Sequence, residues 1–215
     1  MEKNKIIKKM NIYYINIKLN INIMPKNICI IYTETNGLHQ LNETVTKKNI
    51  FGFARLVCLN YVIGYRKDGK FHELKKVREI LEPKCIHFED DAVKFHGITQ
   101  DKAQKKGLDS KIIIKNLADD LRNVQVIVSH NLPFHLRAIQ VECFRTSTYI
   151  NFNDFILIDT INFYHDLGFL NLLKLANKLF NKSFSKKKPK DYVKVIRKVF
   201  IELYNRYENT TISKT

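Results

Sequence analysis

Residues 28–38 read Ile-Cys-Ile-Ile-Tyr-Thr-Glu-Thr-Asn-Gly-Leu and carry the strongest structural signal in the chain. The apolar run from Ile28 to Ile31 gives way to polar residues from Thr33 onward. A short apolar run of this kind is typical of a central strand buried on both faces. Side chains two residues apart on a strand share a face, so Tyr32 and Glu34 are expected to lie together at its end.

The other elements follow from hydrophobic periodicity and turn residues. Further strands are predicted over residues 53–64 and 71–80, joined by a hairpin at Asp68-Gly69, and over residues 124–128 and 155–158. Apolar spacings of three and four residues predict helices over 110–122, from Pro133, from Leu172 and over 191–206, with Asn131 and Asn171 as N-caps and Thr99 capping a shorter helix. This order predicts an α/β fold with an antiparallel pair at one edge of its sheet.

The composition limits the classes of partner. The chain has 215 residues, which fits one domain, and a formal net charge of +16 at pH 7. Such a positive excess attracts polyphosphates through counterion release and favours a nucleic-acid partner. The alternative is that AT-rich coding inflates lysine, asparagine and isoleucine. The cysteines lack the spacing of a zinc site and are expected to be buried and reduced: Cys29, Cys58, Cys85 and Cys143.

The two ends of the chain are expected to lie outside the domain. Residues 1–23 are predicted to be an N-terminal extension, residues 24–207 the domain, and residues 208–215 a flexible tail. The basic start is followed by residues too polar for the apolar core of a signal peptide, and no apolar run has the length of a membrane span. An intracellular protein of the cytoplasm or nucleus, neither secreted nor bound to a membrane, is therefore expected.

Five further segments, taken in order, resemble one family of enzymes. They are Ala54–Val57, Glu82-Pro83, His96–Thr99 followed by Ala103 and Gly107, Val-Ser-His-Asn-Leu-Pro-Phe-His at residues 128–135, and Ile158–Thr160. Together with residues 28–38 they are similar to the 3′–5′ exonucleases of the DEDDh class, the proofreading-exonuclease-like family, and most similar to those of large DNA viruses. The resemblance runs from about Asn27 to Tyr207. It implies a ribonuclease-H-like mixed five-stranded sheet with helices on both faces.

The resemblance also implies a catalytic site from which key groups are missing. Such an enzyme places four carboxylates around two divalent ions and uses a histidine as general base. Glu34 and Asp191 match two of these carboxylates, whereas Tyr32 and His135 stand at the positions of two aspartates and Lys186 stands at that of the histidine. A phenol titrates near pH 10, and a lysine acts as a base only after a large fall in pKa. Ordinary hydrolysis is therefore expected to be lost or weak.

The metal and nucleic-acid contacts remain open at this point. Glu34 and Asp191 are candidates to hold one Mg or Mn ion, or to bind none, and His135 is a candidate third ligand. A histidine at the start of a helix is, however, more often a surface residue. The resemblance implies nucleic-acid contacts for Thr35, Leu38, His96, Asn131, Lys186, Lys187 and Lys188. The alternatives are loop packing for His96, a cap for Asn131, and a nuclear-import-like signal for the lysine run.

Three functions from different classes fit these observations. The first is an exonuclease-fold protein that binds single-stranded DNA or RNA and is catalytically impaired. The second is an active metal-dependent 3′–5′ exonuclease with an atypical site. The third is a structural or protein-interaction scaffold that keeps the fold. Binding and digestion of single strands separate the three.

Overall fold

The fold was obtained as a computed structural model that describes residues 27–38, 44–84, 87–163, 170–181, 184 and 192–212. The predicted N-terminal extension, Cys85, Lys186 to Lys188 and Asp191 therefore lie outside the described residues. Among the described residues, no helix is long and apolar enough to cross a lipid bilayer.

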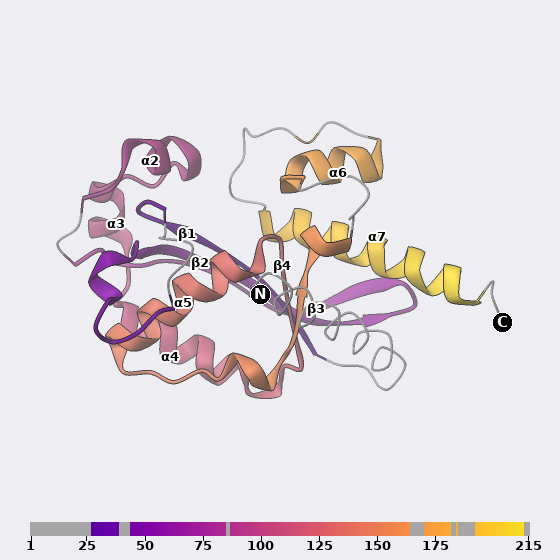
Figure 1. Ribbon diagram of the computed structural model, residues 1–215, viewed down its shortest axis with the longest axis horizontal. Coiled ribbons are helices and arrows are strands. Elements are labelled where there is room, and N and C mark those ends of the chain that lie inside the picture. Colours follow the sequence, from indigo (N-terminus) through magenta and orange to yellow (C-terminus); the bar gives the residue numbers. More distant parts are fainter. Residues whose placement is uncertain are drawn as a thin grey trace, which may run out of the picture.

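A single mixed sheet forms the centre of the molecule (Figure 1). Its strands are β1 (Ile28–Thr35), β2 (Leu56–Lys67), β3 (Lys70–Ile80), β4 (Val126–Ser129) and β5 (Ile156–Asp159), in the order β3-β2-β1-β4-β5. β1 and β2, and β2 and β3, pair antiparallel, whereas β4 is parallel to both β1 and β5. The prediction of a mixed five-stranded sheet with an antiparallel edge is confirmed, with strand ends shifted by up to three residues.

The hairpin between β2 and β3 has the geometry that its sequence predicts. Asp68 and Gly69 have φ angles of 51° and 70°, so both central residues adopt left-handed backbone conformations. A two-residue turn of this type matches the right-handed twist of the strands it joins, and Asp-Gly is a preferred pair for it.

Helices cover both faces of the sheet (Figure 1). On one face, α4 (Ser110–Asp120) and α5 (Leu132–Thr146) pack on Cys29, Ile31 and Tyr61. On the other face, α6 (Leu172–Phe180) and α7 (Tyr192–Ile212) pack on Ile28, Ile30 and Val62. Shorter helices complete the fold: α2 (Asp90–His96), α3 (Gln100–Lys106), η1 (Ile50–Gly52), η2 (Leu121–Asn123), η3 (Phe152–Asp154) and η4 (Thr160–Phe163). Alternate residues of β1 thus enter two separate cores, as expected for a central strand.

Two of the three predicted helix caps are confirmed by side-chain hydrogen bonds. The hydroxyl of Thr99 accepts a hydrogen bond from the backbone N–H of Lys102 at 3.1 Å, and the side chain of Asn171 accepts one from Lys174 at 3.0 Å. The predicted burial of Cys29, Cys58 and Cys143 is also confirmed. The last helix is longer than predicted, because α7 continues to Ile212 and so enters the predicted tail.

The third predicted cap, Asn131, does occupy the N-cap position of α5, but it differs from Thr99 and Asn171 in how the helix end is satisfied. Asn131 has a left-handed backbone with φ 64°, and its side chain makes no capping hydrogen bond. The carboxylate of Asp159, at the end of β5, accepts hydrogen bonds from the backbone N–H groups of Asn131 and Leu132, both at 2.9 Å, and from Ile161 at 3.0 Å. A neighbouring strand therefore satisfies the N-terminus of the helix and holds the turn before it.

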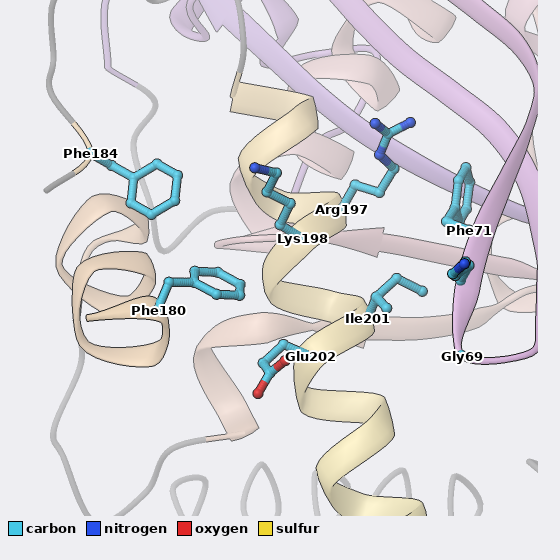
Figure 2. Close-up of a pocket in the computed structure, with 9 residues that line it drawn as sticks. Gly69, Phe71, Phe180, Phe184, Arg197, Lys198, Ile201 and Glu202 are labelled. Carbon is cyan, nitrogen blue, oxygen red and sulfur yellow. The ribbon is translucent and has the colours of Figure 1, made fainter. Parts of the chain in front are cut away.

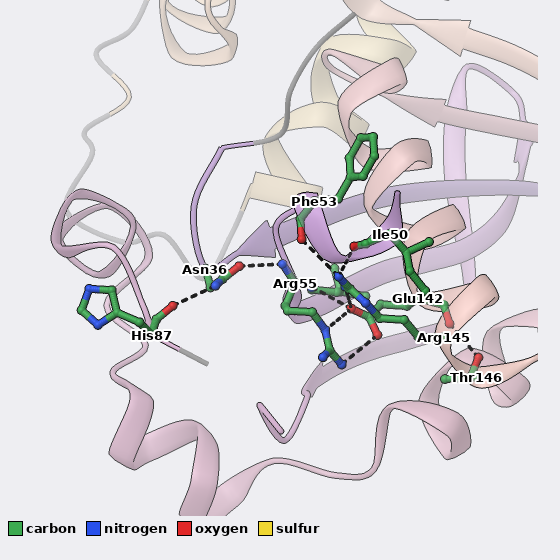
Figure 3. A network of polar contacts seen from close by, with 9 residues as sticks. Asn36, Ile50, Phe53, Arg55, His87, Glu142, Arg145 and Thr146 are labelled. Atoms are coloured by element: carbon green, nitrogen blue, oxygen red, sulfur yellow. Dashed lines mark hydrogen bonds and ion pairs between the residues drawn. The ribbon is translucent and has the colours of Figure 1, made fainter. Parts of the chain in front are cut away.

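A buried ion-pair network links α5 to the start of β2 (Figure 3). The side chain of Glu142 is fully buried, and its carboxylate accepts hydrogen bonds from Arg55 Nε and Arg145 Nη1, both at 2.9 Å, and from Leu56 N at 3.3 Å. Arg145 also donates to the backbone carbonyls of Ile50 and Phe53. This network fixes the irregular segment before β2 against the helix layer.

Candidate active-site cavity

A cavity of about 610 Å³ opens at the end of β1. Its walls come from β1, the segment after it, α2, the turn before α5, the first turn of α5, the start of α6 and the first residue of α7. Of the site residues predicted from the sequence, the structure brings together at this cavity Tyr32, Glu34, Thr35, Leu38, His96, Asn131 and His135. Tyr192, the residue after Asp191, also lines it, so the segment that carries the third predicted motif arrives at the same place.

Aromatic rings stack along one wall of the cavity. Tyr32 and Tyr192 stack with centroids 4.8 Å apart, and Phe95 stacks on the far side of Tyr192 at 5.9 Å. His135 lies 4.7 Å from Tyr32, and Phe134 meets His135 edge-on at 5.4 Å. We call these five rings, Phe134, His135, Tyr32, Tyr192 and Phe95, the ring row. Offset and edge-on contacts of this kind stabilise a fold beyond the burial of their apolar area.

His135 is buried, so its interpretation as a surface residue is wrong. His135 is only 3% exposed, and its Nδ1 accepts a hydrogen bond from the backbone N–H of Thr33 at 3.1 Å. Because Nδ1 is an acceptor, the proton of the neutral ring lies on Nε2, which donates to the carbonyl of His130 at 3.2 Å. Both ring nitrogens are therefore used by the protein itself, and metal coordination would break one of these hydrogen bonds.

Tyr32 and Glu34 share one face, as predicted, and both are sheltered from water. Burial, and then the nearby charge of Glu34, raises the pKa of Tyr32 well above its ordinary value of 10.0. Burial raises the pKa of Glu34 to about 8, although Arg78 lowers it. At neutral pH the phenol is neutral, and the raised pKa of Glu34 lessens the negative charge that its carboxyl adds to the cavity.

The remaining predicted contacts differ in exposure. Leu38 is 82% exposed at the cavity, whereas His96 is buried and its Nδ1 accepts from the backbone N–H of Ile98 at 3.0 Å. Thr35 is also buried, and its hydroxyl donates to the carbonyl of Gly37 at 2.6 Å. Asn131 is exposed. Leu38 and Asn131 are therefore the accessible members of the group, and His96 combines loop packing with a place in the cavity wall.

His130 is a buried neutral histidine in the cavity wall. Its Nδ1 lies 2.8 Å from the hydroxyl of Thr160, and its Nε2 lies 3.0 Å from the carbonyl of Leu170. Burial lowers the pKa of His130 to about 4, although the bond to Leu170 raises it. The residue thereby ties the turn before α5 to the segment that leads into α6.

We expect acid to destabilise the protein through His130. Because the folded-state pKa lies below the ordinary value of 6.5, the unfolded chain binds the proton first as pH falls. The stabilisation is fully present above about pH 6.5 and is lost between about pH 6.5 and 4, by on the order of 3 kcal/mol. Urea unfolding at both pH values would measure it, and His130→Gln should show a smaller fall. An equal fall in both proteins would assign the acid sensitivity to other groups.

The described residues do not fit a two-metal site. No group of three His, Cys, Asp or Glu side chains among the described residues is placed to hold a metal ion. Glu89 and Asp91 also line the cavity, but the described residues do not group three such side chains around Glu34, as a hard divalent ion would need. Asp191 and Lys186 lie outside the described residues, so the pairing of Glu34 with Asp191 stays a prediction.

Sequence reasoning did not single out three residues of the ring row. Phe95 lies in α2, Phe134 in the first turn of α5 and Tyr192 at the start of α7. Phe134 lies beside His135 and Tyr192 beside Asp191, so adjacency to the motifs is the signal that could have identified these two. Phe95 likewise lies beside His96, so the same signal applies to it.

The comparison with known families agrees with this geometry. The family model described as Exonuclease (RNase T) matches residues 30–202, which span β1 to α7. The chain belongs to this exonuclease family. Among curated proteins no significant match is found. All five residues of the ring row lie within the matched range.

Solved structures of exonucleases share this fold at low sequence identity. A product-bound exonuclease I has a TM-score of 0.66 at 14% identity, over 86% of this chain and 45% of that one. Escherichia coli exonuclease I in complex with a dT13 oligonucleotide has a TM-score of 0.66 at 13% identity, over 87% of this chain and 43% of that one. A 3′-exonuclease solved in a study of 3′-end-specific recognition of a histone mRNA stem-loop has a TM-score of 0.64 at 12% identity. That match covers 86% of this chain and 84% of the other. The chain thus spans less than half the length of the exonuclease I chains.

Proposed function

We propose that this exonuclease-family protein binds the end of a single-stranded DNA or RNA in the cavity at the end of β1 and hydrolyses it weakly or not at all. The observation that carries the proposal is the ring row, in which Tyr32 and His135 occupy the positions that the resemblance assigns to metal-binding aspartates. Both side chains are held by ring contacts, and His135 also by hydrogen bonds, so they form a fixed part of the cavity wall.

Three physical features support binding. Every nucleobase has a flat aromatic face, and stacking on protein rings holds single strands with little sequence preference. The net charge of +16 draws the phosphate backbone toward the protein. Replacing carboxylates by neutral rings also removes groups that would repel phosphate in the absence of metal. The related exonuclease I has been solved with a bound dT13 oligonucleotide, which is the kind of ligand proposed here.

One experiment distinguishes the proposed function from the two other candidate functions. End-labelled single strands of DNA and RNA are incubated with the protein in Mg²⁺ and in Mn²⁺, beside a binding titration at several salt concentrations. Binding without digestion supports the proposal. Digestion that Glu34→Gln abolishes would favour an active enzyme that holds one ion through Glu34 and Asp191. The absence of both binding and digestion would favour a protein-interaction scaffold.

We expect the lysine run to supply phosphate contacts. Changing Lys186, Lys187 and Lys188 together to glutamate should weaken single-strand binding and lower the slope of log K against log salt by about one unit per lost contact. The matched control makes the same charge change at exposed lysines of α3 and α4: Lys106, Lys111 and Lys115. An equal loss in both variants would mean that net charge acts without a specific phosphate site.

We also propose limits and a setting for the domain. The family match over residues 30–202 supports a domain within residues 24–207, although α7 itself continues to Ile212. Buried thiols at Cys29, Cys58 and Cys143 support an intracellular setting, in the cytoplasm or nucleus. The similarity to exonucleases of large DNA viruses, read from the motifs, is likewise a proposal.

A further inference from the structure

A second hollow lies along α7, apart from the active-site cavity (Figure 2). It has a volume of about 450 Å³ and shares none of its described lining residues with that cavity. Figure 2 shows Phe180 and Phe184 on the α6 side of α7 and Phe71, from the β2–β3 hairpin, on the opposite side. We call this hollow the α7 groove. Its other lining residues are Gly69, Lys70, Arg197, Lys198, Ile201 and Glu202.

Aromatic rings and cations alternate in the α7 groove. Phe180 and Phe184 lie 5.8 Å apart, and Lys198 Nζ lies 6.0 Å from the centroid of the Phe184 ring. The guanidinium of Arg197 lies 5.7 Å from the centroid of the Phe71 ring. The three phenylalanines are only partly buried, so part of each ring reaches the groove. Rings and cations in such proximity are the elements that hold a stacked base and its phosphate.

The charge of the groove also favours a phosphate ligand. Its carboxylate, that of Glu202, pairs with Arg206 at 2.6 Å, and Arg197 pairs with Glu73 at 2.7 Å. Lys70 and Lys198 are exposed, and neither makes an ion pair with a described residue. Glu202 and Glu73 are each paired with an arginine, so the positive charges of Lys70 and Lys198 remain to attract a polyanion.

The groove is within reach of a strand that ends in the active-site cavity. Tyr192 belongs to the cavity wall, and Lys198 and Glu202 follow on the same helix. At 1.5 Å per residue these two residues lie about 9 and 15 Å along α7 from Tyr192. A chain of a few nucleotides can span such a distance, so one strand can contact both places.

We propose that the α7 groove is a second contact site for single-stranded nucleic acid, which stacks a base on Phe180 and Phe184 and places phosphates beside Lys70 and Lys198. This inference rests on the proposed function, because it concerns the same ligand. It adds the path that the strand follows away from the cavity. It also predicts that affinity increases with strand length.

The test compares short and long strands on wild-type protein and two groove variants. The probes are fluorescent oligothymidylates and oligouridylates of about four and about sixteen nucleotides, the range of site sizes in single-strand-binding folds. Wild-type protein should bind the longer probes more tightly. The double variant Phe180→Leu with Phe184→Leu keeps apolar volume but removes the stacking faces, and it should lose about tenfold in affinity for the long probes alone.

The double variant Lys70→Glu with Lys198→Glu should have the same selective effect and a lower salt slope. These side chains are exposed, so folding is expected to survive, and the midpoint of urea unfolding checks this for both variants. Lys111→Glu with Lys115→Glu on α4, across the sheet, is the control with equal charge change. The proposal of a contact site in the α7 groove would be overturned if the variants bound long probes as tightly as wild type, or if they lost equal affinity for short and long probes. Either result would leave the proposed binding in the cavity intact. A wild-type protein that binds neither probe would overturn both proposals.

Discussion

Replacing Glu142 with leucine is expected to lower the free energy of unfolding by about 3–5 kcal/mol. The substitution removes the only carboxylate among the described residues that pairs with either Arg55 or Arg145. It leaves two largely buried guanidinium groups, with side chains 19% and 10% exposed, without their shared carboxylate, and it removes the acceptor of Leu56 N. Uncompensated buried charge is among the most destabilising changes a core can suffer. Urea unfolding monitored by circular dichroism measures the loss.

The matched control is Glu202→Leu, which also removes a helical glutamate paired with an arginine. That pair lies at the surface, with side chains 34% and 52% exposed, so we expect a loss below about 1 kcal/mol. Arg55→Leu alone should fall between the two, because Arg145 still neutralises Glu142. If Glu142→Leu proved as mild as the control, the network would be a passive product of packing, and the segment from Ile50 to Phe53 would be held by other contacts.

Digestion of single strands in Mg²⁺ is expected to be slower by at least about 10⁴-fold than digestion by an exonuclease with a complete site. A positioned general base contributes about 10²–10⁴-fold, and loss of electrostatic stabilisation at the reacting group costs a further factor of 10² or more. Tyr32, His135 and Lys186 replace a base and two metal ligands implied by the resemblance. End-labelled oligonucleotides followed over hours, with exonuclease I as reference, measure the difference.

Glu34→Gln is the internal control for this measurement. Glu34 is the acidic group of the implied set that the structure places in the cavity, so residual digestion that survives this substitution comes from a contaminant. Rapid digestion in Mn²⁺ that Glu34→Gln abolishes would contradict a binding role. Restoring two acids through Tyr32→Asp with His135→Asp is expected to destabilise the fold, because the pair breaks the ring row and places carboxylates in a buried site.

Local sequence signals were sufficient to predict the main strands, turns and helix starts of the fold. The apolar run at Ile28 predicted β1, Asp68-Gly69 predicted the hairpin, and Asn171 predicted the start of α6, and all three are confirmed. Each of these signals acts within a few residues, where backbone conformation and side-chain alternation decide the outcome. The order of the motifs predicted the family. It also predicted that residues such as Tyr32 and His135 lie near one another, because the motifs stand at the ends of strands and the sheet aligns those ends.

Local sequence signals could not predict contacts between distant segments of the chain. The capping of α5 by Asp159 joins residues about thirty positions apart, and Glu142 meets Arg55 across 87 positions, so neither partner could be chosen before the strands were placed. The ring row depends in the same way on Phe95, Phe134 and Tyr192 arriving from three helices. The motifs of the sequence implied that catalytic groups are replaced. Only the packed structure showed that the rings of Tyr32 and His135 contact each other, because ring contacts, burial and pKa values depend on neighbours that folding brings together.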